Sequence, residues 1–369
     1  MSEVKNFAAK LLTWRKAYGR QGLPWQNEKD PYKVWLSEIM LQQTQVLTVI
    51  ERYHSFLKRF PNIDVLAKSS QDDVLHEWAG LGYYTRARNL HRCAQIIHES
   101  LNSEFPKKAE ELEQLPGIGR STAAAIAAFC FEERVSILDG NVKRLLSRVF
   151  GIRSIISQVQ TEKKLLEIAE SMLPKNKKDM PAYTQALMDF GATVCKPKQA
   201  LCLIDKKEVR KCIYQNICFA YREDQVELIP QKIKKEKTKE VMSEMLLIVS
   251  KGHVLLEKKS GEGIWGGLWS LPETKWVDKN EESNFELAMY DVISKIISKK
   301  QYQIGKIYTP RRHVFTHRIL YFQVRQINIE NKNKLASEDW IWCPIEDLKG
   351  FGYPKPIKEL LSDFFNLTQ

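Results

Sequence analysis

Apolar residues recur roughly every three to four positions over most of the first 220 residues, a spacing that places them on one face of a helix. The pattern is clearest in residues 31–60 (PYKVWLSEIMLQQTQVLTVIERYHSFLKRF) and 121–131 (STAAAIAAFCF). Glycine, proline and aspartate separate these stretches, as they do at helix ends. We therefore expect an all-helical region over residues 1–220.

The pattern changes once along the chain. Residues 221–240 (YREDQVELIPQKIKKEKTKE) lack a sustained apolar face and are crowded with lysine, so they are expected to form a connector. The β-rich segments MLLIVS, HVLLEK, YQIGKIY and RILYFQVRQI follow, with the helical candidates NFELAMYDVISKI and PIKELLSDFF between and after them. This mixture predicts a smaller α+β domain over residues 241–369.

Length and charge narrow the class of protein. The 369 residues are about twice the usual domain size, so at least two cores are expected. The excess of 57 Lys and Arg over 45 Asp and Glu favours a polyanionic partner. The first 20 residues carry no apolar signal core, and nowhere do about 18 apolar residues run together. We expect a soluble cytoplasmic protein with no membrane partner.

Residues 115–126 (LPGIGRSTAAAI) place a glycine pair before an alanine-rich helix. A dinucleotide-binding loop needs a preceding strand and a third glycine, and a P-loop needs Gly-Lys-Ser/Thr, but a helix-like segment precedes this pair and neither completion is present. A tight hairpin between two helices remains. The amides of Gly117 and Gly119 could bind a phosphate there, and a plain helix–helix turn is an equally good interpretation.

Glu38 is a candidate general acid. It lies in the middle of a predicted helix with Val34, Trp35 and Leu41 on the same side, so burial would raise its pKa. From the residues alone, a surface glutamate at the edge of a helix face is the simpler interpretation.

Asp139 follows the apolar run VSIL and precedes the predicted helix 142–150 (VKRLLSRVF). A helix cap is the commoner role for aspartate at such a position. The two roles are compatible, since helix-terminal amides would also keep the carboxylate ionised.

Four of the seven cysteines, Cys195, Cys202, Cys212 and Cys218, fall within a short segment. In a chain without an export signal, such a group favours metal binding over disulfides. The other three are expected to be small buried residues: Cys93, Cys130 and Cys343.

Residues 34–46, 78–90, 115–126 and 137–152 together closely resemble the MutY-type adenine DNA glycosylases of the helix-hairpin-helix superfamily. The resemblance runs from about residue 23 to 218 and is weaker in the C-terminal domain. It implies excision of adenine mispaired with 8-oxoguanine or guanine in double-stranded DNA, by a monomer at the nucleoid. It also implies a six-helix barrel with the hairpin over about 27–135, and a second helical, iron–sulfur subdomain formed by 1–26 and 136–220.

The resemblance assigns roles to the residues near the reacting bond. Glu38 would protonate adenine at N7, Asp139 would stabilise the oxocarbenium ion, and Asn141 would position the substrate. The related endonuclease III-type lyases carry lysine where this chain has Ser121, so a monofunctional enzyme is expected, although Ser121 alone could be a helix N-cap. Lys143 is the nearest other amine that could act as the nucleophile. Its position on the predicted helix is expected to direct it away from the sugar, toward a phosphate.

The same resemblance suggests how DNA is held while the adenine is flipped out. Gln43 and Tyr83 would wedge beside the orphaned oxidised guanine, and Thr44 would contact it. For Tyr83, packing in the core is the alternative. Gly117 and Gly119 would contact the DNA backbone.

The C-terminal domain resembles the family's Nudix-like domain through residues 263–273 (GIWGGLWSLPE) and 311–322 (RRHVFTHRILYF). Phe315, Thr316 and His317 match the Phe-Ser-His loop that checks for 8-oxoguanine, with threonine in place of serine.

A Nudix box begins at Gly267 and Glu273, but the required Arg-Glu and Glu-Glu pairs do not follow. Metal-dependent pyrophosphate hydrolysis is therefore not expected.

The four clustered cysteines resemble the family's [4Fe–4S] ligands. The outer spacings of Cys195 to Cys202 and Cys212 to Cys218 match, whereas the middle gap holds nine residues where two are usual. Four thiolates could still converge if this gap loops out.

Three functions compete at this point. The first is the adenine glycosylase, and the second is an endonuclease III-like lyase, against which Ser121 argues. The third is a non-catalytic iron–sulfur DNA-binding protein, or a Nudix hydrolase whose helical half only binds. The first requires that the side chains of Glu38 and Asp139 share one cavity.

Overall fold

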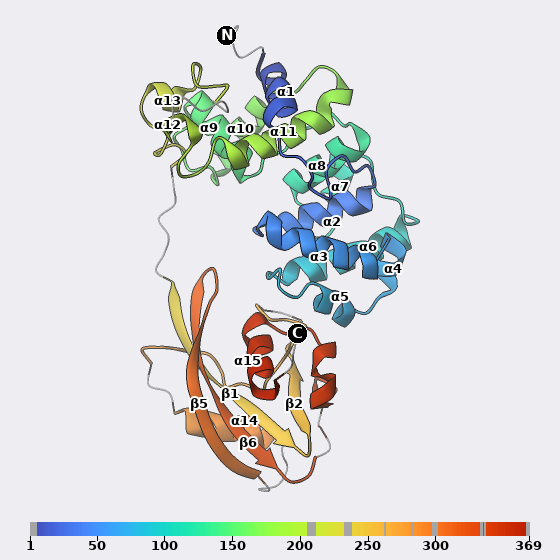
Figure 1. Ribbon diagram of the computed structural model, residues 1–369, viewed down its shortest axis with the longest axis vertical. Helices are drawn as coiled ribbons and strands as arrows, with labels where there is room; N and C mark the ends of the chain where they lie inside the picture. Colours follow the sequence, from blue (N-terminus) through green and yellow to red (C-terminus); the bar gives the residue numbers. More distant parts are fainter. Residues whose placement is uncertain are drawn as a thin grey trace. The chain divides into compact units, whose positions relative to one another are not determined.

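The computed structural model describes residues 6–204, 212–231, 238–261, 263–281, 284–296, 302–332, 335 and 337–366. The chain divides into two compact units. The first comprises residues 1–68 and 89–234, and the second comprises residues 69–88 and 235–369. Figure 1 labels most of the helices and the longer strands.

The described residues of the first unit are helical, as the apolar spacing predicts. In chain order the helices are α1 (Phe7–Tyr18), α2 (Pro31–Leu41), α3 (Val46–Arg59), α4 (Ile63–Lys68), α6 (Thr85–Ser100), α7 (Ala109–Leu112), α8 (Arg120–Phe131), α9 (Gly140–Phe150), α10 (Val159–Ser171), η2 (Lys177–Asp179), α11 (Met180–Thr193), α12 (Leu201–Ile204) and α13 (Phe219–Arg222). None of the helices in the described part of the chain has the length and apolar composition needed to cross a membrane.

The alanine-rich helix α8 lies at the centre of the first unit. Residues 122–128 are buried on every side of the helix. Their small side chains allow α2, α7 and α11 to pack closely around it. Because α2, α8 and α11 meet here, residues far apart in the sequence can line one cavity.

A hydrophobic core joins α1, α9, α10 and α11 with the cysteine segment. Its members include Leu145, Leu146 and Phe190. Val226 and Ile229, which lie in the predicted connector 221–240, are also buried in this core. The first half of segment 221–240 is therefore packed against the helical unit, and strand β1 begins near the end of this segment.

In the described residues of the second unit, seven strands form one sheet with the order β3-β2-β1-β6-β5, in which β4 pairs with β1 and β7 with β2. Its strands are β1 (Lys239–Ser250), β2 (His253–Lys258), β3 (Trp269–Ser270), β4 (Val277–Asp278), β5 (Tyr302–Val314), β6 (Arg318–Ile329) and β7 (Trp340–Pro344). Strands β1 and β6 are parallel, and the other pairs are antiparallel. The α+β prediction for the C-terminal region is confirmed.

Helices complete the second unit. They are α5 (Gln71–Glu77), α14 (Phe285–Ile296), η3 (Ile345–Gly350) and α15 (Lys355–Phe365). On α14, Met289 and Ile293 pack against Leu246 of β1 and Ile327 of β6. This amphipathic helix therefore covers one face of the sheet.

Segment 69–88 of the predicted helical region belongs to the second unit. Arg88 Nη1 donates to the carbonyl oxygen of Gly266 at 2.7 Å, and Tyr84 Oη donates to that of Tyr353 at 3.1 Å. Residues 1–220 therefore do not all belong to one compact unit.

The predicted start of a Nudix box ends at Glu273. After it, the chain forms the short strand β4 and then a turn at residues 279–280. The carboxylate of Glu273 pairs with Lys259, at 2.9 Å between Oε1 and Nζ. That this domain does not hydrolyse pyrophosphates stays a prediction from the sequence.

Candidate active site

One cavity of about 770 Å³ lies in the first unit. It is bounded by the C-terminal half of α2, the N-termini of α8 and α9, and one face of α11. The candidate residues that line it are Glu38, Gln43, Thr44, Ser121, Asp139 and Asn141. The side chains of Glu38 and Asp139 therefore share a cavity, which was the condition set by the sequence.

Helix α2 carries Glu38 to the cavity. The side chain of Asp30 caps this helix by accepting from Tyr32 N at 2.9 Å, and Pro31 occupies its first turn. Trp35 and Leu36 are fully buried, whereas Glu38 is half-buried because it faces the cavity.

The environment of Glu38 favours its protonated form. Burial, and secondarily the charge of Asp139, raise the pKa of Glu38 to about 8. A carboxyl group with this pKa is mostly protonated at neutral pH and can donate a proton.

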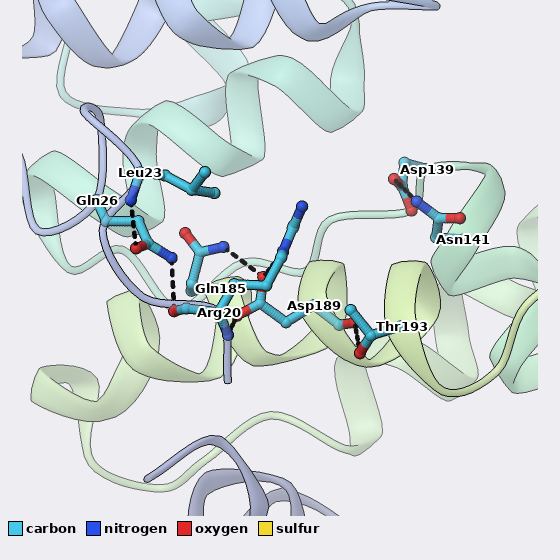
Figure 2. Close-up of polar contacts among 8 residues, drawn as sticks. All are labelled: Arg20, Leu23, Gln26, Asp139, Asn141, Gln185, Asp189 and Thr193. Carbon is cyan, nitrogen blue, oxygen red and sulfur yellow. Dashed lines mark hydrogen bonds and ion pairs between the residues drawn. The ribbon is translucent and has the colours of Figure 1, made fainter. Parts of the chain in front are cut away.

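Asp139 is the N-cap of α9, as its position in the sequence indicates. Its Oδ1 accepts from Val142 N at 2.8 Å, and its Oδ2 accepts from Asn141 Nδ2 at 3.4 Å. Figure 2 shows Asp139 and Asn141 side by side at the start of the helix. These two hydrogen bonds fix the carboxylate at the start of α9.

Asn141 is held by residues that the sequence did not single out. Arg144 Nη2 donates to Asn141 Oδ1 and to the carbonyl oxygen of Gly191, both at 2.8 Å, and its Nε donates to that of Cys195 at 2.8 Å. A Cβ atom on Gly191 would lie 2.6 Å from Cβ of Asn141. Because Arg144 occupies Oδ1, the amide nitrogen of Asn141 is directed to Asp139 (Figure 2).

Ser121 lies in the second position of α8 rather than at its N-cap, which is Gly119. The capping role suggested by the sequence is therefore wrong. Ser121 Oγ accepts from Leu138 N at 3.2 Å and lines the cavity. This hydrogen bond joins α8 to the segment that ends at Asp139.

The glycine pair forms the expected turn between α7 and α8. Gly117 has a φ of 77°, in the left-handed region, and a Cβ atom there would lie 2.8 Å from Cβ of Asn89. Gly119 has a φ of −84°, and a Cβ atom added to it would meet no other atom within 4 Å. Local geometry thus requires glycine at position 117 but not at position 119.

Lys143 is not part of the cavity lining. Its ammonium group pairs with Glu162 Oε1 at 2.9 Å. Two other lysines, Lys29 and Lys178, do line the cavity, and Lys29 Nζ donates to the carbonyl oxygen of Phe129 at 3.1 Å.

The cavity also has a polar wall that the sequence did not reveal. Asp189 on α11 is fully buried, and its Oδ1 accepts from Arg20 Nε at 2.7 Å and from Gln185 Nε2 at 3.0 Å (Figure 2). Arg20 and Gln185 line the cavity. A buried carboxylate with two such donors fixes both side chains.

The wedge candidates have unusual backbone conformations. Gln43 (φ 56°) and Tyr83 (φ 48°) are both in the left-handed region, which is rare for residues other than glycine. Gln43 is exposed in the turn between α2 and α3, and Thr44 follows it at the cavity.

Tyr83 is 46% exposed, whereas the neighbouring Tyr84 is 7% exposed. Core packing therefore describes Tyr84 and not Tyr83. The Tyr83 hydroxyl lies 2.7 Å from Thr316 Oγ1, within the second unit. Two of the residues predicted to contact the oxidised guanine are thus in direct contact.

Known proteins carry the same combination of domains. Residues 36–171 match the HhH-GPD superfamily of base excision DNA repair proteins, and residues 244–363 match the NUDIX domain. The chain is 35% identical to the adenine DNA glycosylase of Buchnera aphidicola subsp. Baizongia pistaciae, over 96% of both chains. The chain belongs to the adenine DNA glycosylase family. It is also 30% identical to the Homo sapiens adenine DNA glycosylase, over 91% of this chain and 69% of that one.

Solved structures resemble the helical unit of this adenine DNA glycosylase. A thermostable thymine-DNA glycosylase matches with a TM-score of 0.53 and 25% identity, over 60% of this chain and 98% of that chain. An endonuclease III in complex with DNA matches with a TM-score of 0.50 and 16% identity, over 60% of this chain and 97% of that one. This protein is therefore a base-excision-repair glycosylase with the helix-hairpin-helix fold.

The four clustered cysteines of the glycosylase are free thiols in the first unit. Burial, and then the neighbouring cysteines Cys195, Cys202 and Cys218, raise the pKa of Cys212. Arg148 Nη1 donates to Cys195 Sγ at 3.5 Å. The four sulfur atoms are thus close enough to influence one another electrostatically.

Within the described residues, no three Cys, His, Asp or Glu side chains converge closely enough to bind a single metal ion. An iron–sulfur cluster is wider than one ion, so its four cysteine ligands lie farther apart. Four mutually interacting thiols with a nearby arginine fit such a group chemically. Most of the long gap between Cys202 and Cys212, residues 205–211, lies outside the described residues.

Proposed function

We propose that this glycosylase hydrolyses the N-glycosidic bond of adenine mispaired with 8-oxoguanine or guanine in double-stranded DNA. The adenosine is flipped into the first unit's cavity, because the bond cannot be reached inside a stacked duplex. The observation that carries the proposal is the shared cavity in which Glu38 has a pKa of about 8 beside Asp139.

Glu38 acts as the general acid. A neutral carboxylic acid can protonate N7 of the departing adenine, which turns a poor leaving group into a good one. A glutamate with the ordinary pKa of 4.5 would be almost fully ionised at neutral pH. Burial of the Glu38 side chain is therefore what makes it suitable for the role.

Asp139 stabilises the sugar cation that forms as the bond breaks. Two carboxyl groups with different protonation states suit a reaction that needs a proton at one end of a bond and negative charge at the other. Asn141, which donates to Asp139 at 3.4 Å, keeps this carboxylate oriented. Water then adds to the sugar and leaves an abasic site.

The enzyme is proposed to be monofunctional. Ser121 lines the cavity where a lyase would present an amine, and Lys143 is paired with Glu162. Lys178 replaces Lys143 as the rival nucleophile to test, because it lines the cavity, and the other lysine there, Lys29, donates to the carbonyl oxygen of Phe129. Borohydride trapping of a covalent adduct that disappears in Lys178→Ala would contradict the monofunctional assignment.

DNA is proposed to contact both units. Gln43, Thr44 and Tyr83 would occupy the space around the orphaned base, and the hairpin amides at Gly117 and Gly119 would bind a phosphate. Phe315, Thr316 and His317 would recognise 8-oxoguanine. The enzyme would act as a monomer at the nucleoid.

Cys195, Cys202, Cys212 and Cys218 would hold a [4Fe–4S] cluster, which supplies a structural cross-link of this segment when bound. Arg144 connects the same segment, at the carbonyl oxygen of Cys195, to Asn141. Purified protein that lacks iron and lacks broad visible absorbance would remove this part of the proposal.

The decisive experiment uses duplex DNA with adenine opposite 8-oxoguanine, analysed with and without hot alkali. Strand breaks at the adenine that require alkali indicate a monofunctional glycosylase, whereas breaks without alkali indicate a lyase. Glu38→Gln and Asp139→Asn should each abolish the product. Glu28→Gln is the matched control, because Glu28 lines the same cavity but its pKa is lowered, mainly by the backbone amide of Asp30. No breaks under either condition would reject the proposal.

A further inference from the structure

The lesion-recognition candidates lie at the tip of the hairpin formed by β5 and β6. The last paired residues are Val314 and Ile319, and Phe315 N donates to the carbonyl oxygen of Arg318 at 2.8 Å. Strand β5 is at the edge of the sheet, and Thr316 and His317 are exposed. A hairpin tip at an edge requires contacts outside the hairpin if its side chains are to be held in one position.

Phe315 supplies such contacts through a cluster of aromatic rings. Its ring centroid lies 5.8 Å from those of Trp265 and Trp276, which lie 5.4 Å from each other at an interplanar angle of 79°. His313 packs edge-on against Phe315 at 4.6 Å. Offset and edge-to-face pairs of this kind fix ring orientation as well as burying apolar area.

Trp276 is in turn held by a buried group of charges. Its Nε1 donates to Glu273 Oε2 at 2.9 Å, while Lys259 Nζ contacts Glu273 Oε1 at 2.9 Å and Glu257 Oε2 at 2.6 Å. The side chains of Lys259 and Glu273 are 16% and 11% exposed. Burial would lower the pKa of Lys259, but the two carboxylates raise it above its ordinary value, so the ammonium stays charged.

The charged group is fixed to the framework of the sheet. Lys259 follows β2 directly, its N donates to the carbonyl oxygen of Leu268 at 2.9 Å, and its own carbonyl oxygen accepts from Gly267 N at 2.9 Å. A continuous set of contacts therefore runs from β2 through Lys259, Glu273 and Trp276 to Phe315. The hydroxyl of Thr316, the next residue after Phe315, lies 2.7 Å from that of Tyr83.

We propose that Trp276, anchored by Glu273 and Lys259, is a positioning residue that fixes the Thr316 hydroxyl for recognition of 8-oxoguanine. The inference rests on the proposed function, which assigns the lesion to this loop. At its N7–C8 edge, 8-oxoguanine differs from guanine by a proton on N7 and an oxygen on C8. Discrimination between the two bases therefore depends on a few hydrogen bonds. Such bonds weaken steeply when distance or angle changes, and a mobile tip would lose the preference for the lesion.

The measured quantity is the lesion preference, defined as the adenine excision rate opposite 8-oxoguanine divided by that opposite guanine, at a protein concentration below saturation. We expect Trp276→Ala to lower this preference about tenfold, the size of one lost hydrogen bond. Trp276→Phe keeps a ring but loses the donor to Glu273, so we expect a smaller loss, about threefold. The rate opposite guanine should stay unchanged in both variants.

Trp340→Phe is the matched control, because Trp340 packs against the separate core beneath α14. Its lesion preference should equal that of the unmodified enzyme. Equal losses opposite 8-oxoguanine and guanine in the Trp276 variants would overturn the proposal, since that pattern reports general damage to the fold. Unchanged preference in Trp276→Phe and Trp276→Ala would overturn it as well.

A double-mutant cycle with Thr316→Ala separates positioning from independent contact. If Trp276 acts through Thr316, the double variant should have the lesion preference of Thr316→Ala alone. Additive losses would overturn the proposal. An enzyme that excises adenine opposite guanine but shows no lesion preference rejects this inference and leaves the glycosylase function intact, whereas no excision from either duplex rejects the proposed function itself.

Discussion

Glu38 and Asp139 face the same cavity, and the charge of Asp139 helps to raise the pKa of Glu38 to about 8. The two carboxyl groups come from different helices and have different surroundings. Glu38 lies in the last turn of α2 among apolar neighbours, and Asp139 accepts hydrogen bonds at a helix N-terminus. Under the proposed function, this difference in environment would separate a proton donor from an anion within one site.

The first prediction concerns the pH dependence of excision. Because the proposed acid must be protonated, the single-turnover rate should be constant below about pH 8 and should fall about tenfold per unit above it. The measurement is adenine release from a duplex with adenine opposite 8-oxoguanine between pH 6 and pH 10. A rate that already declines above pH 5 would show that Glu38 has an ordinary pKa in the enzyme.

The second prediction concerns stability. The folded-state pKa of Glu38, about 8, exceeds the unfolded value of 4.5, so the folded protein holds the extra proton and loses stability as pH rises between these values. Glu38→Gln removes this loss. Since the side chain is only half-buried, we expect a gain of about 2 kcal/mol in the free energy of unfolding at pH 9 and none at pH 4.

Urea denaturation of the helical unit at both pH values measures this gain. Glu28→Gln is expected to behave in the opposite way, because the pKa of Glu28 is lowered in the folded state, mainly by the amide of Asp30. The stabilisation that ionised Glu28 provides is present above the unfolded-state pKa of Glu28 and is lost as the pH falls through its folded-state pKa. An equal gain for Glu38→Gln at pH 4 and pH 9 would indicate a cause other than proton linkage.

Local sequence signals predicted the parts of the site that depend on one helix. The helical phase of residues 31–41 placed Glu38 near apolar neighbours, and the position of Asp139 before residues 142–150 predicted its cap. These features follow from spacing of about 3.6 residues per turn and from the preference for Asp at N-caps. The family resemblance then joined the two residues in one site.

Other parts of the site depend on contacts between distant segments, which spacing does not reveal. Arg20 and Asp189 are separated by 169 positions and form the polar wall only when α11 packs beside α1. Segment 69–88 looks like any amphipathic helix pair, but its side chains pack in the second unit. The alternative role of Ser121 as a helix cap was wrong because Gly119, which has no side chain, is the N-cap.

The third prediction tests the packing behind Asn141. Gly191→Ala would place Cβ 2.6 Å from Cβ of Asn141, so the amide must move away from Asp139. We expect the single-turnover rate to fall about tenfold or more, as small misplacements of positioning groups are costly. Substrate affinity should change less than the rate. Gly350→Ala, which meets nothing within 4 Å, is the control, and a Gly191→Ala enzyme with full activity would show that Asn141 tolerates displacement.

The fourth prediction separates the two glycines of the hairpin. Alanine at position 117 would require a left-handed backbone, with φ 77°, and would lie 2.8 Å from Cβ of Asn89. A left-handed alanine costs about 1–2 kcal/mol, and the turn must shift to relieve the contact. We therefore expect Gly117→Ala to weaken binding to undamaged duplex DNA about tenfold, because the phosphate-binding amides move.

Gly119→Ala is the matched control for this variant. At φ −84° alanine fits without strain, meets nothing within 4 Å and keeps the backbone amide. Its affinity, measured by fluorescence anisotropy at the same salt concentration, should equal that of the unmodified enzyme. Equal weakening by both substitutions would indicate that open space beside the hairpin is needed by DNA, and unchanged binding in both would leave the hairpin as a structural turn only.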